Sequence, residues 1–403
     1  MKKNMKTKNI TLIKQNKCCG CEACVNSCPQ KLISMKSDKA GFLYPVLLDE
    51  SKCIHCGKCL KSCPVFEKNI PDRIDKRKKE LYFWVKDNDN LISCSSGGLA
   101  TYLYKSFLAD GGYIVGVKYA EDIRSANFLL TRDAKNIDSF KGSKYIQAKK
   151  NNIYTSIKEA LGAGNRVLFV GLPCEVAAMK RMSNSHDLYT CELICHGPTS
   201  GKMLSKYIAL LEEQKGTKVI GYTSRYKNPN WKPLNSKVTY ADGTEHSQLF
   251  AATELGKAFQ MLKRRSCNNC EYKNGVTAAD LTIGDFHAAK EDRGDYNING
   301  VSICFVNTTQ GESLIALLSP DEVVMGVANH DAAIANRALQ ESMPKLPGRQ
   351  RFIRKMERKG LEAAAKDFII NIVLKYRKYP YRLKLRICRF FKRVSKKISN
   401  IFH

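Results

Sequence analysis

Beyond residue 80, short apolar runs alternate with longer segments in which apolar residues recur at three- and four-residue steps. Four short runs predict strands, at residues 81–85, 113–119, 167–170 and 188–194, and further strands are expected at 219–223, 236–240, 281–283 and 301–306. Helices are predicted at 98–109, 153–161, from about residue 174, and at 202–213. This order predicts an α/β domain with a mixed sheet, which we place at residues 81–344.

The segments that flank this pattern are polar and basic. Residues 69–80 contain Pro71 and eight charged side chains and read as a linker, while residues 1–17 form a basic extension. Residues 345–403 read as a basic, amphipathic helical tail. After Pro380 its apolar residues form one helical stripe, namely Leu383, Ile387, Phe390, Phe391, Val394, Ile398, Ile401 and Phe402. Such a stripe opposite Lys and Arg predicts contact with an anionic membrane surface, and the alternative is a helix packed on the protein's own surface.

Charge and composition narrow the class of protein. Of the net charge of +29, residues 1–17 carry six lysines without an acid, and residues 345–403 carry nineteen Lys and Arg against three acids. We expect no nucleic-acid partner, because such a partner requires basic residues spread over a folded face. The chain has neither an apolar run of about eighteen residues nor a secretory signal, so a cytoplasmic location is expected, peripheral to the inner membrane face at most.

Nine of the seventeen cysteines lie within residues 18–63. They include two copies of C-x2-C-x2-C-x3-C followed by proline, the spacing of bacterial two-cluster ferredoxins, so residues 18–68 predict an α+β ferredoxin-like head with two 4Fe-4S clusters. In that arrangement the fourth cysteine of each copy binds the other cluster. The first cluster is then bound by Cys18, Cys21, Cys24 and Cys63, and the second by Cys53, Cys56, Cys59 and Cys28.

Disulfides and zinc explain this pattern less well. Without an export signal the thiols stay reduced, and zinc sites favour two separated C-x2-C pairs over a triplet with a proline-flanked fourth cysteine. Cys19 is surplus to the pattern and is read as incidental. Because residues 18–63 hold all eight ligands, the head clusters are expected to be separable from the rest of the chain.

Loops at predicted strand ends carry further candidate chemistry. Ser95, Ser96, Gly97 and Gly98 open a helix, where backbone N–H groups favour an anion, although an ordinary helix cap is the simpler reading. Lys144 and Tyr145 follow Gly142, and the lysine is a candidate for a phosphate or a flavin ring or simply a solvated side chain. Gly171 and Pro173 precede Cys174, whose position at a helix start favours a thiolate.

A second group of cysteines lies within the α/β domain. Cys174, Cys195, Cys267 and Cys270 form a sensible set of four ligands, with Cys191 in reserve. The spacing alone leaves zinc and a third 4Fe-4S cluster equally open, since both accept four thiolates. Cys304 and Cys388 are taken as structural.

Together these motifs resemble the coenzyme F420 hydrogenase/dehydrogenase beta-subunit family in its form with a fused two-cluster head. The resemblance covers residues 18–310 and rests on the double cysteine motif, Ser95–Gly98, residues 142–145, 171–174, 193–197, Cys267-x2-Cys270 and 280–286. It implies a third cluster bound by Cys174, Cys195, Cys267 and Cys270. It also implies FAD bound near Ser95, Ser96, Gly97, Gly98, Lys144, Tyr145, Gly171, Pro173 and Asp285.

The resemblance thus implies an oxidoreductase that passes electrons between ferredoxin-type clusters and a flavin-bound two-electron substrate or carrier, with a redox protein or a small electron carrier as partner. Leu172 and His287 depart from the family pattern, so the substrate pocket is the least transferable part. Two alternatives stay open. One is an electron-transfer module without its own flavin, and the other is a ferredoxin head on a zinc-stabilised binding domain.

Overall fold

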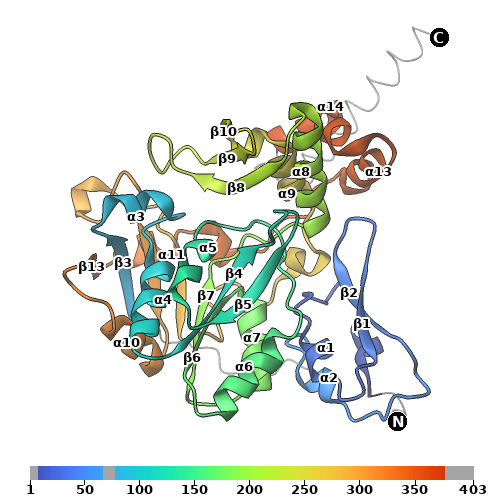
Figure 1. Cartoon of the computed structure of the whole chain (residues 1–403), viewed down its shortest axis with the longest axis horizontal. Coiled ribbons are helices and arrows are strands. Elements are labelled where there is room, and N and C mark those ends of the chain that lie inside the picture. The colour runs from blue at the N-terminus through green and yellow to red at the C-terminus, as the bar shows by residue number, and fades with distance from the viewer. Residues whose placement is uncertain (1–7, 67–77, 377–403) are drawn as a thin grey trace.

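The computed structural model describes residues 8–66 and 78–376, and an eight-stranded mixed sheet forms its centre (Figure 1). The strand order is β13-β3-β12-β11-β7-β6-β4-β5, in which β4, β6, β7 and β11 run parallel and the outer pairs are antiparallel. The strands are β3 (Lys79–Val85), β4 (Tyr113–Tyr119), β5 (Ala126–Thr131), β6 (Val167–Gly171), β7 (Leu188–Leu193), β11 (Leu281–Asp285), β12 (Ser302–Val306) and β13 (Val323–Val327). The predicted α/β domain with a mixed sheet is confirmed.

Helices cover both faces of this sheet because its central strands are apolar on both sides. Leu168 and Val170 of β6 pack with one core cluster, whereas Val167 and Phe169 pack with the other. The first cluster is completed by α4 and α10, and the second by α6, α7 and α8. The helices of this part are α3 (Asn88–Ser93), α4 (Leu99–Ala109), α5 (Ile137–Phe140), α6 (Ile153–Gly162), α7 (Pro173–Met182), α10 (Thr309–Ala316), α11 (His330–Ile334) and α12 (Arg337–Gln340).

A separate three-stranded antiparallel sheet contains β8 (Val219–Tyr226), β9 (Asn235–Tyr240) and β10 (Glu245–Leu249). The strands predicted at 219–223 and 236–240 therefore lie outside the large sheet. A turn at Gly243, with a φ of +80°, pairs β9 with β10 instead. Beside this sheet lie α8 (Gly201–Lys215) and α9 (Glu254–Met261) (Figure 1).

The start of the expected basic tail belongs to the folded body. The helices α13 (Arg349–Ala365) and α14 (Phe368–Lys375) pack against α9, and Phe352, Met356 and Ile370 are buried in the core. Asp367 joins them, because its carboxylate caps α14 and pairs with Arg351 at 2.9 Å. The predicted membrane contact depends on residues after Pro380, which lie outside the described residues.

The head consists of α1 (Ala23–Ser27), α2 (Lys58–Lys61) and a hairpin of β1 (Ile33–Ser37) and β2 (Leu43–Leu47). Its helix α1 lies against α6 and α7 of the α/β domain. The expected linker ends earlier than residue 80, because β3 begins at Lys79. Within the described ranges, no helix is long and apolar enough to span a bilayer.

Candidate functional site

The structure groups the eight motif cysteines of the head into the two crossed sets that the spacing predicts. Cys28, from the first motif, lines the same hollow as Cys53, Cys56 and Cys59 of the second. Cys63, from the second motif, interacts electrostatically with Cys18, Cys21 and Cys24 of the first. The geometry therefore suits two clusters, each with three thiols from one loop and one thiol from the other.

Both cysteine loops turn through left-handed backbone at the same two places. The first place is Gly20 in one loop and His55 in the other, and the second is Glu22 and Gly57, with φ between 49° and 70° throughout. At each place one of the two loops has a residue other than glycine, namely His55 or Glu22. The backbone conformation alone therefore does not require a glycine at position 20. A Cβ on Gly20 would instead lie 2.3 Å from Nη2 of Arg264, so the close approach of that guanidinium requires it.

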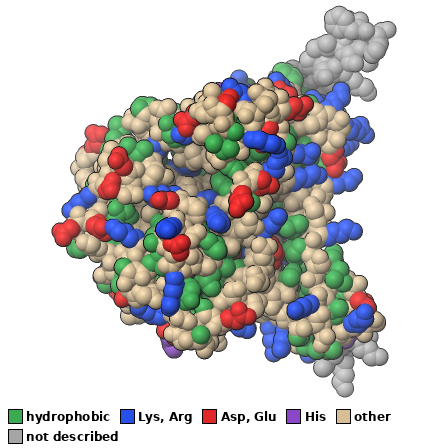
Figure 2. All heavy atoms as spheres, viewed as in Figure 1, with side chains coloured by type: hydrophobic (Ala, Val, Ile, Leu, Met, Phe, Trp, Pro, Cys, Tyr) green, Lys and Arg blue, Asp and Glu red, His purple; other side chains and the backbone are tan. Residues whose placement is uncertain are grey.

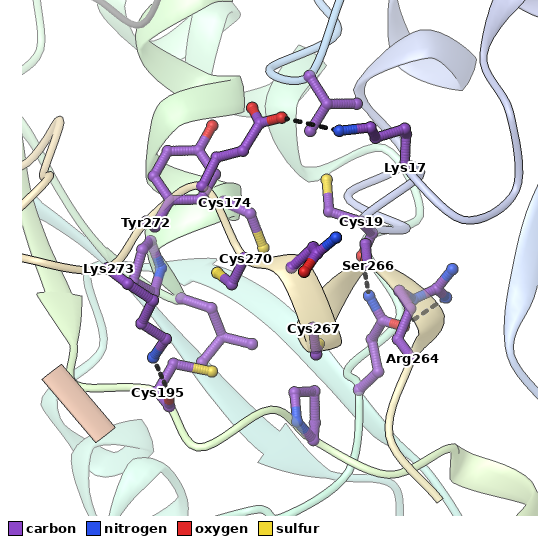
Figure 3. A pocket seen from close by; sticks show the side chains of 17 residues that line it. Lys17, Cys19, Cys174, Cys195, Arg264, Ser266, Cys267, Cys270, Tyr272 and Lys273 are labelled. Atoms are coloured by element: carbon purple, nitrogen blue, oxygen red, sulfur yellow. Dashed lines mark hydrogen bonds and ion pairs between the residues drawn. The ribbon is translucent and has the colours of Figure 1, made fainter. Parts of the chain in front are cut away.

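A second cysteine pocket lies where the head meets the α/β domain (Figure 3). It encloses about 660 Å³ of empty space, part of it open to solvent. All four cysteines expected to form a third set line it. Cys174 begins helix α7, Cys195 follows β7, and Cys267 and Cys270 lie in and directly after a 3-10 helix at Arg265–Asn269.

Cys191, the reserve ligand, does not reach this pocket. Its side chain is buried in the core on the α4 side of the sheet, where it interacts with Cys304. Both thiols therefore have a packing role, as expected for Cys304, whereas Cys388 lies outside the described residues.

Cys19 is the residue that the sequence analysis missed. It belongs to the head, yet its side chain lines the second pocket, and hydrogen bonds with Cys174 and Cys21 lower the pKa of its thiol. A signal was present in the motif. Cys19 lies between two cysteines of the first set, and the structure places its thiol beside both Cys21 of that set and Cys174 of the neighbouring domain.

Burial makes these thiols poor acids in the absence of a cation. It raises the pKa of Cys267 to about 12 and that of Cys270 to about 11. Ionisation therefore requires nearby positive charge, which the irons of a cluster supply. Among residues 8–66 and 78–376, no three His, Cys, Asp or Glu side chains converge on a single metal ion. A cluster does not need that convergence, because each thiolate binds a different iron, so the donor set fits a 4Fe-4S group.

The head is docked onto this pocket through backbone carbonyls of its cysteine loops. Gln147 Nε2 donates to the carbonyls of Cys19 and Gly20 at 2.9 and 3.0 Å, and Ser266 Oγ donates to that of Cys18 at 3.0 Å. Additional contacts run from Arg264 to Leu43 O, from Tyr272 to Pro64 O and from Arg181 to Lys61 O. The head thus forms one wall of the pocket, which the expectation of a separable head did not anticipate.

The loop at Ser95–Gly98 is held by two buried basic residues that the sequence analysis also missed. Arg225, in β8, donates to Ser95 O and to Asp285 Oδ2, both at 2.7 Å, and Lys227 Nζ donates to Ser96 O at 2.8 Å. Burial lowers the pKa of Lys227 to about 8. Two buried cations thus face one carboxylate, Asp285, whose pKa is lowered chiefly by Arg225 against the effect of burial.

Glycines shape the same loop by packing. A Cβ on Gly97 would lie 2.0 Å from Phe83 O, and its N–H donates to Ser302 Oγ at 3.0 Å, so the loop is pressed against the sheet. Gly98, with a φ of +88°, is the N-cap of α4. Ser96 Oγ donates to Val301 O at 2.7 Å.

The remaining predicted cofactor residues divide between the two sites. Tyr145 Oη accepts a hydrogen bond from Arg225 at 3.2 Å and therefore joins the Ser95–Gly98 loop. Lys144 Nζ donates to the carbonyls of Ser139 and Lys141 at the end of α5, so its ammonium is already engaged there. Pro173 lines the second cysteine pocket, and Gly171 ends β6 beside it.

Aromatic side chains connect the two sites. The ring of Tyr145 stacks on Phe259 with centroids 4.8 Å apart, and Phe259 stacks on His196 at 5.5 Å. His196 directly follows Cys195 of the second pocket. A continuous contact therefore runs from Arg225 to the cysteine set.

A buried carboxyl in β7, that of Glu192, leads to a prediction on pH. Burial raises the pKa of Glu192 to about 7, its Oε1 accepts from Thr282, and its Oε2 has no partner among the described residues. The stability that the protonated form contributes below the ordinary pKa of 4.5 is lost as the pH rises through 7. Glu192→Gln is therefore expected to increase the free energy of unfolding at pH 8 by on the order of 1–3 kcal/mol, and with it the melting temperature. At pH 4.5 it should have little effect.

The measurement compares melting curves at the two pH values. Glu213→Gln, at an exposed position on α8, is the control and should change neither curve. An equal gain from Glu192→Gln at both pH values would contradict the assignment of a protonated carboxyl.

Comparison with known proteins matches both the α/β domain and the head to family models. Residues 164–326 match the family model for the C terminus of the coenzyme F420 hydrogenase/dehydrogenase beta subunit. Residues 17–66 and 45–98 match models described as "4Fe-4S dicluster domain". No curated protein matches the chain.

One similar solved structure is a chain of the F420-reducing NiFe hydrogenase complex from Methanosarcina barkeri, in a xenon derivative. It is 17% identical, with a TM-score of 0.45, over 72% of this chain and 91% of that chain. Behind a head that matches the 4Fe-4S dicluster models, residues 164–326 are thus similar to the C-terminal domain of the coenzyme F420 hydrogenase/dehydrogenase beta subunit.

Proposed function

We propose that this iron–sulfur electron-transfer protein is a flavin-dependent oxidoreductase. Its head would exchange single electrons with a redox protein, and its α/β domain would act on a two-electron substrate or carrier. The observation that carries this proposal is the second cysteine pocket, which lies against the head and is joined by Tyr145, Phe259 and His196 to the Arg225 site.

Cys174, Cys195, Cys267 and Cys270 would hold a third 4Fe-4S cluster. Three features support this choice over zinc in a separate binding domain. The thiols line one space, their raised pKa values call for a strong cation, and the pocket is built against the ligand loop of a neighbouring cluster. When bound, such a cluster exchanges one electron at a time.

The Ser95–Gly98 loop, Tyr145 and Asp285, with Arg225 and Lys227, would hold FAD. FAD carries a pyrophosphate, and the two buried cations against one carboxylate leave positive charge for an anion. Figure 2 shows this face hollowed between the β8–β10 sheet and α3, with Lys or Arg side chains inside the opening. When bound, a flavin exchanges two electrons with a substrate and single electrons with clusters.

Flavin content tests this function directly. We expect about one FAD per chain after purification without oxygen, measured by flavin release and chromatography. Lys227→Met should lower that content at least about tenfold, whereas Lys105→Met, which removes an exposed ion pair with Glu322, should retain it.

The main alternative makes the opposite prediction. An electron-transfer module without its own flavin would contain the full complement of iron but no FAD in the wild-type chain. That result would overturn the flavoprotein proposal and leave the protein as a carrier within a larger complex.

A further inference from the structure

Buried cations surround the second cysteine pocket. Lys263, Arg264 and Lys273 are 5%, 2% and 8% exposed. Lys273 Nζ donates to Cys195 O at 2.7 Å, and Lys263 Nζ donates to Gly197 O at 2.5 Å. Each of the three interacts electrostatically with at least one thiol of the set. Low solvent exposure leaves these charges poorly screened, so they act strongly on any charge placed in the pocket.

The acid in the pocket wall does not cancel this charge. Glu271 pairs with Lys17 at 3.7 Å, and both are more exposed than the three cations. Glu175, next to Cys174, is neutralised by Lys150 at 2.5 Å. The pocket therefore keeps an excess of buried basic side chains, one of which, Lys263, has its pKa lowered by burial to about 7.

Arg264 also has an unsatisfied hydrogen-bond donor. Its Nε and Nη2 are bound to Gln147 and Leu43, whereas its buried Nη1 has no hydrogen-bond partner among the described residues. Arg264 lines the pocket. An unsatisfied buried N–H is costly, and sulfur atoms of an anionic cluster are acceptors that would satisfy it.

The two cysteine sets of the head have a less basic environment than the pocket. Lys52, Lys58 and Lys61, near the second set, are exposed to solvent, which weakens their effect. Arg264 also acts on Cys18 of the first set, but the loop of that set carries a buried acid, Glu22, which is 8% exposed and shares Lys150 with Glu175. Of the three cysteine sets, the pocket against the α/β domain is thus the most favourable for added negative charge.

We propose that Lys263, Arg264 and Lys273 raise the reduction potential of a cluster held in this pocket, so that this cluster accepts electrons from the head. This inference rests on the proposed function, since it requires a third cluster. Reduction of the pocket by one electron oxidises the head by one electron, and an external one-electron donor protein restores the head. Hydrogen bonds to sulfur and nearby net charge are the levers that set such potentials.

The test is a redox titration of the full chain, followed by electron paramagnetic resonance without oxygen, with dithionite as reductant. The signal absent from Cys267→Ser identifies the pocket. In the wild-type chain this signal should appear at the highest potential of the three. In Lys263→Gln/Lys273→Gln its reduction equilibrium constant should fall at least about tenfold, a shift of about 59 mV, with the head signals unmoved.

Two matched variants separate an effect of charge on the potential from an effect of structural disruption. Lys257→Gln removes another lysine that donates to a backbone carbonyl, that of Ala365, and should shift no signal. Lys263→Arg/Lys273→Arg keeps both charges and should restore the wild-type potential.

The contrary outcomes are distinct. A pocket signal at the lowest potential, or one that does not move in the double Gln variant, overturns the proposal that these residues raise the potential. If the wild-type chain still contains about twelve irons, the third cluster itself is upheld. About eight irons in the wild-type chain overturn both proposals.

Discussion

Cys267→Ser and Cys270→Ser should each remove about four irons per chain, because each takes away one of the four thiolates proposed to bind the third cluster. Both thiols line the pocket at the head, and the other two proposed ligands, Cys174 and Cys195, line the same pocket. Iron and acid-labile sulfide, measured against protein concentration after purification without oxygen, provide the readout.

Cys191→Ser is the matched control for this prediction. Cys191 is fully buried in the core on the opposite face of the sheet, so its replacement should leave the iron content unchanged. Loss of four irons from Cys191→Ser, with none lost from Cys267→Ser, would show that the ligand set is wrong.

Gly20→Ala should disrupt the docking of the head far more than Gly57→Ala does. Both glycines have a φ of +70°, so a left-handed alanine costs each about 1–2 kcal/mol. At Gly57 the nearest atom to an added Cβ is 4.0 Å away, on Lys8. At Gly20 the Cβ would displace the Arg264 guanidinium, whose hydrogen bonds to Gln147 and Leu43 each contribute about 1.5–3 kcal/mol.

The melting temperature and the rate of limited proteolysis of the full chain measure this effect. We expect a large drop in melting temperature and faster cleavage for Gly20→Ala alone. Equal effects of the two substitutions would mean that Arg264 does not join the head to the pocket.

The cysteine spacing predicted the 4Fe-4S dicluster head, because a cluster requires thiolates at fixed separations along a loop. The order of apolar segments similarly predicted the large sheet. The run of buried apolar residues predicted β6 within one residue of its end. Both predictions rest on local patterns, which can be recognised directly in a sequence.

Contacts between segments that are distant in the sequence could not be predicted in the same way. Cys19 resembled a spare residue because nothing in its own motif indicates that α7 and Cys174 lie opposite it. Arg225 and Lys227 belong to a segment whose sequence does not show that it reaches the Ser95–Gly98 loop, some 130 residues earlier. The helix α13 was assigned to a basic helical tail because its many basic residues conceal the apolar face that packs on α9.

Counting metals in the intact chain tests the central claim most directly, namely that a third 4Fe-4S cluster lies between the head and the α/β domain. Iron, zinc and acid-labile sulfide are measured per chain after purification without oxygen, and Mössbauer spectra identify the cluster type. We predict about twelve irons, all in 4Fe-4S clusters, and no zinc. About eight irons with one zinc per chain would contradict the account.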